Sequence, residues 1–555
     1  MTTQSGPELV DKVAIDLVNE LEASAKVELA ELASARDDNP ATHVSPPGES
    51  EKYQYLVGTY RFLPLAMGLL FCPLLLSLIK FAAISPVLWV FYPWIALQIG
   101  NLCLGAYTSN RTHRVTLDNH RSLVADYQPQ KWASIDVFLP TCNEPLEVLL
   151  NTYRSVRELQ WPGVLKVHVL DDADRPEVRV AATQHKFNYI VRDDRGTLKK
   201  AGNLRSAFSK TDGDFILVLD ADFTVRSDAL FELMPYFEDQ SIGIVQSPQY
   251  FDTSVQQNWL QRSAGATQEL FYRWIQPSRD SSNAAICVGT CALYRRKGLE
   301  SAGGFAPIQH SEDVHTGVRL AKAGFSLRYV PVLVCKGLCP SELYAFVSQQ
   351  YRWATGSMSL MVDKSFYQSS EFSLRRIAPY FTGFFYYLTT GIAVFISNLP
   401  APIMLWFFPD YVRATNYLPL VGVVFSQCIL LPFVTNKRYR PTVMRVQILY
   451  SFAHAQAIFD SVRNQTKAWV PTGAGQSAHS GAKKIIRTMK LVLSLSLTAQ
   501  IGGIINVWHH NGSQNLWPAI AVFLCMSYIY FPLLLAPWSL RVSLRNITQV
   551  LKTKV

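Results

Sequence analysis

The chain has 555 residues, of which 49% are hydrophobic and only 17% are charged, and its formal net charge is +10. This length exceeds that of one compact core, so we expect several domains. The low charged fraction is typical of a membrane protein with a globular insert and argues against a wholly soluble enzyme. A basic balance also suits nucleic-acid-binding proteins, but the basic-aromatic patches that such proteins need outside membrane loops are not visible here, so we expect no nucleic-acid partner.

The first 52 residues form an acidic head, with eleven acidic against four basic residues. The head opens with a helix-start pattern and continues with apolar residues at loosely helical spacing. Residues 37–52 are rich in Asp, Pro and Ser, which predicts a linker. Residues 1–52 are therefore expected to be a head and linker, and no pattern in them indicates their role.

Six apolar runs follow that are long enough to cross a bilayer core of ~30 Å. They are residues 62–79, 87–107, 378–406, 417–434, 488–508 and 516–538. The first two predict a membrane hairpin within residues 53–108, and the last four predict a membrane domain over residues 371–540. Pro400 and Pro402 predict a kink in the third run.

The basic residues of the short loops indicate how these spans are oriented. If the six spans alternate, nearly all of these residues, Arg121, Lys437 and Arg541 among them, fall on one side. The positive-inside rule then places the insert of residues 109–370, the loop of residues 435–487, and both termini, including the tail of residues 541–555, in the cytoplasm. We expect a multi-pass protein of the inner cell membrane.

Inside the insert, short buried-strand runs alternate with helical patterns. The runs cover residues 135–139, 166–170 and 215–219, and each ends at polar residues. This alternation predicts a doubly wound α/β domain, in which ligands bind at the carboxyl ends of the strands.

Two of these runs end in acidic pairs. Asp171 and Asp172 follow the second run, where they suit hydrogen bonds to a uracil or ribose, support of a metal ion, or capping of a helix. Asp220 and Asp222 follow the third run, and residues two apart in an extended segment point the same way. Their carboxylates are suited to one Mg²⁺ or Mn²⁺ ion that bridges phosphate oxygens.

Two further motifs come later in the insert. Ser311-Glu312-Asp313 precedes a predicted helix over residues 314–323, where Asp313 is a candidate general base, or the motif is a helix cap. Gln349, Arg352 and Trp353 have spacings of three and four, which put them on one face of a helix. Trp offers a platform for a sugar ring and Arg stabilises a departing diphosphate, whereas the alternative is an interfacial helix at the lipid headgroups.

In this order, the motifs resemble those of the processive family-2 membrane glycosyltransferases, in the cellulose synthase-like branch. The resemblance covers about residues 132–360, and the flanking spans match in number and place. The segments that carry it are Pro140-Thr-Cys-Asn-Glu144, Asp171-Asp-Ala-Asp-Arg-Pro-Glu-Val178, Lys200-Ala-Gly-Asn203, Asp220-Ala-Asp222, Cys287-Val-Gly-Thr290, Ser311-Glu-Asp313 and Gln349-x-x-Arg352-Trp353.

The resemblance implies a GT-A catalytic domain that uses a UDP-sugar and Mg²⁺ or Mn²⁺, with inversion giving a β-linkage. Asp313 would be the catalytic base, and Asp220 and Asp222 would serve the metal. The residues implied to bind the donor are Thr141, Glu144, Asp171, Asp172, Lys200 and Asp220. Those implied to bind the acceptor end and the diphosphate are Gln349, Arg352 and Trp353.

The chain departs from the family pattern in several places. Cys142 stands where Tyr is frequent, so stacking of an aromatic ring on uracil is not expected there. In place of the gating loop of cellulose synthases, Trp469 and Thr472 lie in a segment that resembles the loops of related synthases and is a candidate lid. Bacterial cellulose synthases carry a cyclic-di-GMP-binding domain at the C-terminus, and we expect none in a chain that ends at Val555.

These observations predict an inverting, processive synthase that polymerises a β-glucan from UDP-glucose and moves it through its membrane channel. An accessory export subunit is a candidate partner. The alternatives are a synthase of another β-polysaccharide, of the mannan, chitin or hyaluronan type, and a non-catalytic polysaccharide-channel subunit. The second alternative predicts broken acidic motifs, and here the motifs are intact. Selectivity among these donor sugars depends on the geometry of the pocket.

Overall fold

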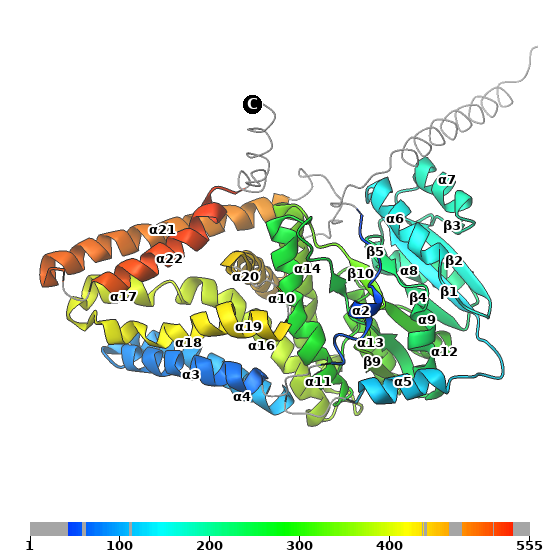
Figure 1. Cartoon of the computed structure of the whole chain (residues 1–555), viewed down its shortest axis with the longest axis horizontal. Helices are drawn as coiled ribbons and strands as arrows, with labels where there is room; N and C mark the ends of the chain where they lie inside the picture. Colours follow the sequence, from blue (N-terminus) through cyan, green and yellow to red (C-terminus); the bar gives the residue numbers. More distant parts are fainter. Residues whose placement is uncertain are drawn as a thin grey trace, which may run out of the picture.

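The computed structural model describes residues 43–57, 63–109, 114–435, 437, 441–465, 480–513 and 516–536. These residues form a bundle of long helices next to an α/β domain, with α14 (Leu343–Met361) and α20 (Pro441–Val462) between the two parts (Figure 1). The predicted head up to residue 42 and the candidate lid residues Trp469 and Thr472 lie outside the described residues.

The α/β domain is built on a seven-stranded mixed sheet, in the order β3-β2-β1-β4-β8-β6-β9. Its strands are β1 (Ile135–Thr141), β2 (Leu165–Asp171), β3 (Asn188–Ile190), β4 (Phe215–Val218), β6 (Ile242–Gln246), β8 (Ala292–Arg295) and β9 (Ser326–Tyr329). Strand β8 runs antiparallel to β4 and β6, and the other neighbours pair in parallel. The three predicted strands are therefore confirmed as the central β2-β1-β4 of a GT-A fold.

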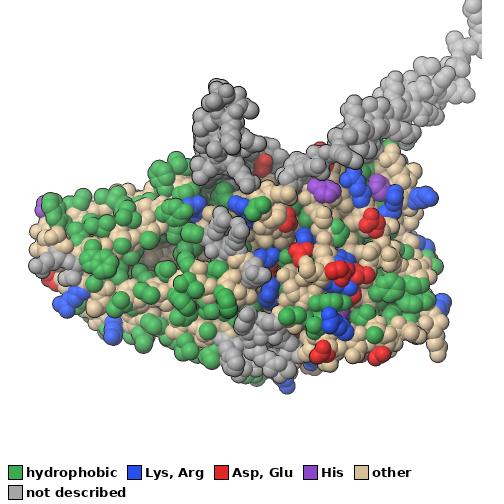
Figure 2. Space-filling view, viewed as in Figure 1, with side chains coloured by type: hydrophobic (Ala, Val, Ile, Leu, Met, Phe, Trp, Pro, Cys, Tyr) green, Lys and Arg blue, Asp and Glu red, His purple; other side chains and the backbone are tan. Residues whose placement is uncertain are grey.

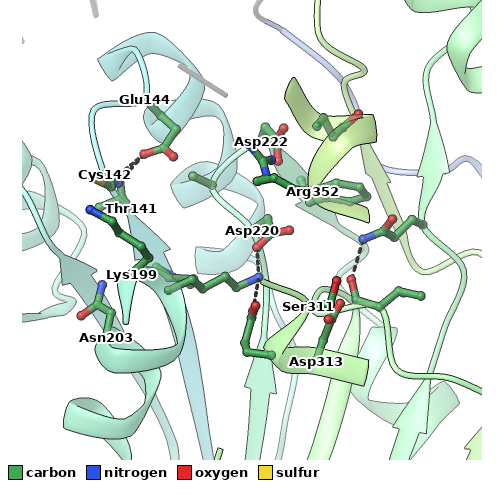
Figure 3. Close-up of a pocket in the computed structure, with 18 of the residues that line it drawn as sticks. Thr141, Cys142, Glu144, Lys199, Asn203, Asp220, Asp222, Ser311, Asp313 and Arg352 are labelled. Carbon is green, nitrogen blue, oxygen red and sulfur yellow. Dashed lines mark hydrogen bonds and ion pairs between the residues drawn. The ribbon is translucent and has the colours of Figure 1, made fainter. Parts of the chain in front are cut away.

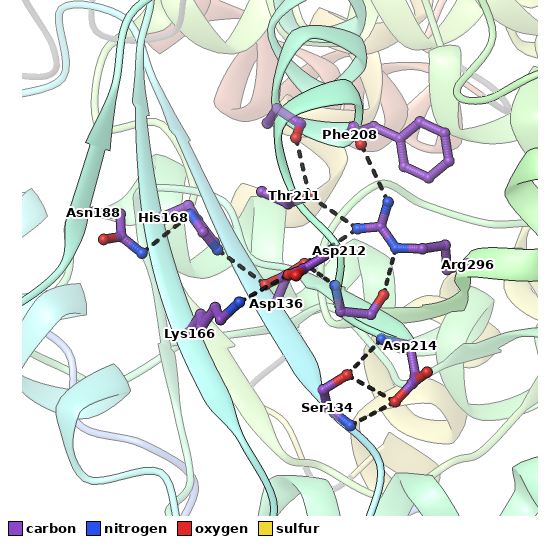
Figure 4. Close-up of polar contacts among 12 residues, drawn as sticks. Ser134, Asp136, Lys166, His168, Asn188, Phe208, Thr211, Asp212, Asp214 and Arg296 are labelled. Atoms are coloured by element: carbon purple, nitrogen blue, oxygen red, sulfur yellow. Dashed lines mark hydrogen bonds and ion pairs between the residues drawn. The ribbon is translucent and has the colours of Figure 1, made fainter.

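The central strands β1 and β4 are buried along their whole length and largely apolar, as expected where helices cover a sheet on both sides. The covering helices include α6 (Leu146–Arg157), α7 (Pro176–Gln184), α8 (Lys199–Lys210), α12 (Arg296–Ser301) and α13 (Glu312–Lys322). One polar residue, Asp136, lies inside β1 and is fully buried. It accepts hydrogen bonds from Gly213 N at 2.7 Å and Arg296 Nη2 at 3.2 Å and contacts His168 Nε2 at 3.0 Å, which joins neighbouring elements (Figure 4).

A second, three-stranded sheet lies beside the main one. It consists of β5 (Phe223–Val225), β10 (Cys335–Gly337) and β7 (Tyr250–Phe251), in the order β5-β10-β7. Strand β5 begins directly after Asp222, and β10 precedes α14 by a short turn. This small sheet therefore joins the segments that carry two of the predicted motifs.

Six helical stretches in the other part are long and apolar enough to span a membrane. They are Leu65–Ala82, Pro86–Thr108, Leu374–Phe407, Ala414–Thr435, Ser480–Asn511 and Trp517–Leu534. They correspond to the six predicted runs, and charged side chains are sparse over this part while they crowd the α/β domain (Figure 2). The predicted kink is a break between α16 (Leu374–Ile396) and α17 (Pro400–Phe407).

Part of the predicted loop of residues 435–487 is a helix. Helix α20 covers 22 residues and packs against α14, α16 and α10 (Trp259–Leu270). Its polar residues, including His454 and Asp460, are buried together with its apolar ones. Because α20 is enclosed between the membrane helices and the α/β domain, it lacks the two-faced pattern by which a surface helix is recognised.

The expected linker likewise ends in a packed segment. Residues 43–57 lie against the α/β domain, and we call this segment the strap. Within it Tyr55 is buried in the main core, Asn151 Nδ2 donates to Val44 O at 2.9 Å, and the Lys52 ammonium pairs with Asp228 at 2.6 Å. Residues 43–52 are therefore not a free linker, because their polar groups have partners on the domain.

Candidate active site

A cavity of about 200 Å³ lies at the carboxyl ends of β1 and β4, where an α/β fold places its ligands. Its lining includes ten of the predicted site residues: Thr141, Glu144, Asp172, Lys200, Asp220, Asp222, Asp313, Gln349, Arg352 and Trp353. Figure 3 shows that Asp220, Asp222, Asp313 and Arg352 approach this cavity from different segments. The structure thus brings together residues more than 200 positions apart in the sequence.

The loop after β1 is held in shape by Glu144. Its carboxylate accepts hydrogen bonds from Thr141 Oγ1 at 2.7 Å and from Cys142 N at 2.5 Å. The guanidinium of Arg175 donates to Thr141 Oγ1 at 3.0 Å and to Glu144 O at 2.6 Å. Thr141 and Glu144 therefore organise the rim of the cavity, and burial raises the pKa of the Cys142 thiol to about 11, which keeps it neutral.

The two carboxylates after β2 have different surroundings. Asp171 is fully buried and does not line the cavity; its carboxylate accepts from Arg175 N at 2.7 Å, Ala173 N at 3.0 Å and Tyr189 Oη at 2.9 Å. Asp172 lines the cavity and receives Arg192 Nε at 2.6 Å and Nη2 at 2.9 Å. Asp171 thus shapes the turn that presents Asp172.

Lys200 connects the segment after β4 with the segment at the start of α13. Its ammonium pairs with Asp220, donates to Gly289 O at 2.8 Å and lies 3.9 Å from a carboxylate oxygen of Glu312. Burial would lower the pKa of Lys200, but Asp220 and Glu312 raise it above its usual value, so the ammonium stays charged. Asp220 is fixed from behind, because its N–H donates to Thr290 Oγ1 at 2.8 Å.

Asp222 is the carboxylate whose surroundings suit a metal ion. Burial and the nearby charges of Asp220 and Glu144 raise the pKa of Asp222 to about 7, and the ion pairs found among the described residues do not include it. Two adjacent carboxylates, one of them without a cationic partner at contact distance, fit a hard divalent cation. Within the described part of the chain, no group of three or more His, Cys, Asp or Glu side chains is arranged to hold a metal alone, so phosphate or water oxygens would complete the ligand set.

Two glycines bring Asp313 into the cavity. At Gly356 of α14 a Cβ atom would lie 1.8 Å from Ser311 Oγ, so only glycine lets this helix meet the start of α13. At Gly289 the φ angle is +79° and a Cβ atom would lie 2.9 Å from an Asp313 carboxylate oxygen. The predicted helix begins at Glu312, two residues earlier than expected, so Asp313 lies in its first turn.

The environment of Asp313 favours its neutral form in the free protein. Burial and the neighbouring Glu312 carboxylate raise the pKa of Asp313 to about 7, against the opposing effect of Lys200. Val314 N donates to one carboxylate oxygen at 2.8 Å. A carboxyl group with a pKa near 7 is well matched to taking a proton from a hydroxyl at neutral pH.

The helix α14 supplies the opposite wall. Gln349, Arg352 and Trp353 all line the cavity, as their helical spacing predicts. Burial lowers the pKa of the Arg352 guanidinium to about 10, although Glu312, Asp220 and Asp222 act in the other direction. The guanidinium therefore remains charged at neutral pH and is the cation that α14 offers to an anionic ligand.

Three contributors were not among the predicted site residues. Glu312 had a signal, because it stands in the same three-residue motif as Asp313. Thr290, which fixes Asp220, belongs to a quoted motif to which no role was given. Arg192, which donates hydrogen bonds to Asp172, had no signal in the sequence. It stands outside the quoted motifs, and its role depends on where the chain turns after β3.

Comparison with known proteins finds a family model that matches the chain from the start of β4 onward. Residues 215–436 match the family model described as glycosyl transferase family group 2. The chain is 34% identical over 233 residues to the cellulose synthase catalytic subunit [UDP-forming] of Xanthomonas axonopodis pv. citri (strain 306), a match that covers 40% of this chain and 31% of that protein. The corresponding subunit of Pseudomonas fluorescens (strain SBW25) is 35% identical over 234 residues, covering 41% of this chain and 32% of that protein. The chain thus spans about a third of the length of these relatives.

Among solved structures, the chain is similar to the mannosyltransferase PcManGT from Pyrobaculum calidifontis in complex with GDP-Man and Mn²⁺. The identity is 18%, the TM-score is 0.48, and the match covers 67% of this chain and 99% of that one. It is also similar, with a TM-score of 0.26 and 18% identity, to glucosyl-3-phosphoglycerate synthase from Mycobacterium tuberculosis, with 41% of this chain and 77% of that one covered. Residues 215–436 thus match a glycosyl transferase family 2 model, and the motifs around them are similar to those of cellulose synthase catalytic subunits.

Proposed function

We propose that this protein is an inverting, processive glycosyltransferase that builds a β-glucan from UDP-glucose and moves it across the membrane in which it is embedded. One observation carries the proposal. A candidate base, Asp313, a carboxylate pair, Asp220 and Asp222, and an Arg-Trp helix face share one cavity, and the helix that carries Arg352 and Trp353, α14, lies between the α/β domain and the membrane part.

The donor would lie across the carboxyl ends of β1 and β2. Thr141, Glu144 and Asp172 line that side of the cavity and offer acceptors for the ribose and base, while Lys200 lies next to Asp220, where the diphosphate is expected. This proposal keeps the predicted donor-binding roles of these residues and gives Asp171 the indirect role of shaping the turn beneath Asp172.

A divalent cation, Mg²⁺ or Mn²⁺, would be held by Asp220 and Asp222 and would neutralise charge on the diphosphate oxygens. Arg352, on α14, supports the same task from the opposite wall, because its guanidinium can donate to the departing diphosphate. Both effects stabilise the negative charge that develops as UDP leaves.

The transfer would be a single displacement. Asp313 accepts the proton of the acceptor hydroxyl while that oxygen bonds to the anomeric carbon, and the bond from this carbon to the diphosphate breaks with both electrons going to UDP. Trp353 provides a flat apolar surface for the terminal sugar and Gln349 a hydrogen-bonding group beside it. Because the acceptor attacks from the side opposite to the leaving group, an α-linked donor gives a β-linkage.

The membrane part offers polar and aromatic groups that suit a sugar chain. Tyr386 and Tyr387 of α16 contact His454 of α20, with ring centroids 5.6 and 4.8 Å apart. Tyr386 and Tyr387 lie in a predicted span, where polar groups are costly and tend to mark a substrate path, and His454 lies in α20, which packs against that span. By contrast, Phe381 and Phe385 line an apolar groove between α16 and α4 (Tyr92–Ser109), so of the aromatic residues of α16 only Tyr386 and Tyr387 enter this proposal.

A donor screen tests the choice of sugar. Purified protein in nanodiscs, with Mg²⁺ or Mn²⁺, receives labelled UDP-glucose, UDP-N-acetylglucosamine or GDP-mannose in parallel. The proposal expects a high-molecular-weight product from UDP-glucose that a β-glucanase digests. Incorporation from another donor alone would favour a synthase of the chitin, hyaluronan or mannan type. No incorporation from any donor, with bound UDP still detectable, would favour a non-catalytic channel subunit.

Inside-out membrane vesicles test translocation, and with it the proposed cytoplasmic side of the catalytic domain and the inner-membrane location. UDP-glucose is added outside the vesicles, and the product is then exposed to β-glucanase before and after detergent. The proposal expects a product that is protected until detergent opens the vesicles. A product fully digestible without detergent would contradict translocation while leaving the transferase proposal intact.

A further inference from the structure

The strap is connected to the small sheet through one carboxylate, that of Glu51. Lys336 Nζ of β10 donates to Glu51 Oε2 at 2.6 Å, and Tyr250 Oη of β7 donates to Glu51 Oε1 at 3.0 Å. Strands β10 and β7 are neighbours in this sheet, so Glu51 holds two of its three strands. The strap also pairs along the backbone with the same region, because Leu333 N donates to Lys52 O at 2.8 Å.

The small sheet joins the two walls of the cavity. Strand β5 begins at Phe223, directly after the carboxylate pair, and pairs with β10 from Phe223–Gly337 to Val225–Cys335. After β10, the chain passes Leu338, which lines the cavity, and enters α14 with Arg352 and Trp353. The pairing of β5 with β10 therefore sets the distance between the carboxylates of one wall and the guanidinium of the other.

The residues of β7 alternate between the cavity and the strap. Gln249, just before the strand, and Phe251 line the cavity, whereas Tyr250 between them faces Glu51. This alternation is the normal consequence of extended backbone, in which neighbouring side chains point to opposite faces. Glu51 therefore lies on the opposite side of β7 from the cavity, one strand away from it.

A residue of the membrane part contacts the same place. Lys437 Nζ, in the segment between α19 (Leu431–Thr435) and α20, donates to Tyr250 Oη at 2.8 Å and lies 3.7 Å from Glu269 of α10. The ammonium groups of Lys336 and Lys437 lie 5.5 and 4.6 Å from the centre of the Tyr250 ring. Without the Glu51 carboxylate, the ammonium groups of Lys336 and Lys437 would both face the Tyr250 ring, and Glu269 would be the acidic group left beside them.

We propose that Glu51 is a positioning residue for the transfer reaction: it clamps β10 and β7 from behind, and so fixes the Arg352 wall relative to the Asp220 and Asp222 wall. The clamp acts on catalysis more than on donor binding, because Thr141 and Asp172, which the proposed function assigns to the ribose and base, lie at the ends of β1 and β2 in the main sheet. This inference rests on the proposed function for its rate measurement alone, since the clamp itself is testable without turnover.

The test compares Glu51→Gln with a matched control, Glu49→Gln. Glu49 lies in the same strap, its side chain is 78% exposed, and its partner Arg226 keeps two contacts with Asp228 at 2.8 and 2.9 Å. Three quantities are measured in full-length protein in nanodiscs: kcat and KM for the donor, the dissociation constant of UDP, and hydrogen exchange at residues 250–251 and 335–337.

Glu51→Gln is expected to lower kcat roughly tenfold, because small displacements of catalytic groups slow a reaction strongly. The UDP dissociation constant should change by a smaller factor than kcat, because the contacts to the ribose and base are kept, and hydrogen exchange should rise in β7 and β10. The double variant Lys336→Gln with Glu51→Gln should slow turnover no more than Glu51→Gln alone, because both changes remove the same contact between Lys336 and Glu51. Glu49→Gln should match wild type in every measurement.

Two outcomes would overturn the clamp. Unchanged exchange in β7 and β10 in Glu51→Gln would show that the carboxylate does not hold these strands. An equal loss of UDP affinity and kcat, together with a lower melting temperature, would show a general structural role. If wild-type protein turns over no donor, the proposed function fails, and the exchange measurement still decides whether the clamp exists.

Discussion

Replacing Asp313 with Asn should remove the base while leaving the cavity in shape. The change keeps the size of the side chain, and Val314 N can still donate to its carbonyl oxygen, as it does to the carboxylate at 2.8 Å. A positioned general base contributes about 10²–10⁴ in rate. At 1.36 kcal/mol for each factor of ten, this corresponds to about 3–5 kcal/mol of barrier. Turnover of UDP-glucose by Asp313→Asn should therefore fall by at least a hundredfold.

The pKa of Asp313 gives the same variant a second signature. Burial and Glu312 raise this pKa to about 7, so the wild-type rate should rise as the pH increases through about 7 and fall about tenfold per pH unit below it. A raised carboxyl pKa also costs stability: the unfolded carboxyl ionises near 3.9 and the folded one near 7, so the penalty grows between these pH values and is fully present above pH 7. At pH 8 the Asn variant, which carries no charge there, should therefore have a higher melting temperature than wild type.

The assay measures labelled polymer, bound UDP and melting temperature on one preparation. Asp214→Asn serves as the control, because Asp214 contacts Ser134 at 2.7 and 2.9 Å and does not line the cavity. Loss of turnover with retained UDP binding and a raised melting temperature supports the base role. Turnover within tenfold of wild type would refute it, and a lowered melting temperature would refute the electrostatic reasoning.

Three further predictions follow from other parts of the site and the fold. Asp222→Asn should weaken activation by Mn²⁺ at least tenfold, measured as the metal concentration for half-maximal rate, whereas an unchanged requirement would exclude Asp222 as a ligand. Trp353→Ala should shorten the polymer and raise the acceptor requirement while UDP binding stays the same; products of normal length would contradict the platform role. Asp136→Asn should lower the stability of the α/β domain by about 1–3 kcal/mol, since a buried polar contact is lost. Burial would raise the pKa of Asp136, but its contacts with His168, Gly213 and Arg296 outweigh burial and lower it. The stability that the Asp136 carboxylate contributes is therefore present above the unfolded pKa of about 3.9 and is lost as the pH falls through the lower folded pKa. A stability difference from wild type that grows below pH 4 would contradict this.

The parts of the fold that sequence reasoning found are those with a strong local pattern. The three central strands are continuous apolar runs that end at polar residues, and the membrane helices are apolar over more residues than any buried strand. Gln349, Arg352 and Trp353 were placed together because helical spacing alone puts them on one face. In each case a short stretch of chain contains the whole signal.

The parts that sequence reasoning missed depend on contacts between distant segments. Helix α20 is enclosed on several sides, so its buried residues show no face. The strap has a linker's composition, yet Glu51 meets Lys336 across 285 positions. The indirect role of Asp171 follows from the backbone N–H groups of Ala173 and Arg175, which no pattern of side chains reveals.

The central claim is that Asp313 promotes an inverting transfer from UDP-glucose to a growing β-glucan. The most direct measurement supplies purified protein with labelled UDP-glucose and a divalent cation and determines the linkage of the polymer and the UDP released. We predict a β-linked glucan, one UDP released for each glucose added, and at least a hundredfold less polymer from Asp313→Asn. An α-linked product, or a β-glucan made equally well by Asp313→Asn, would contradict it.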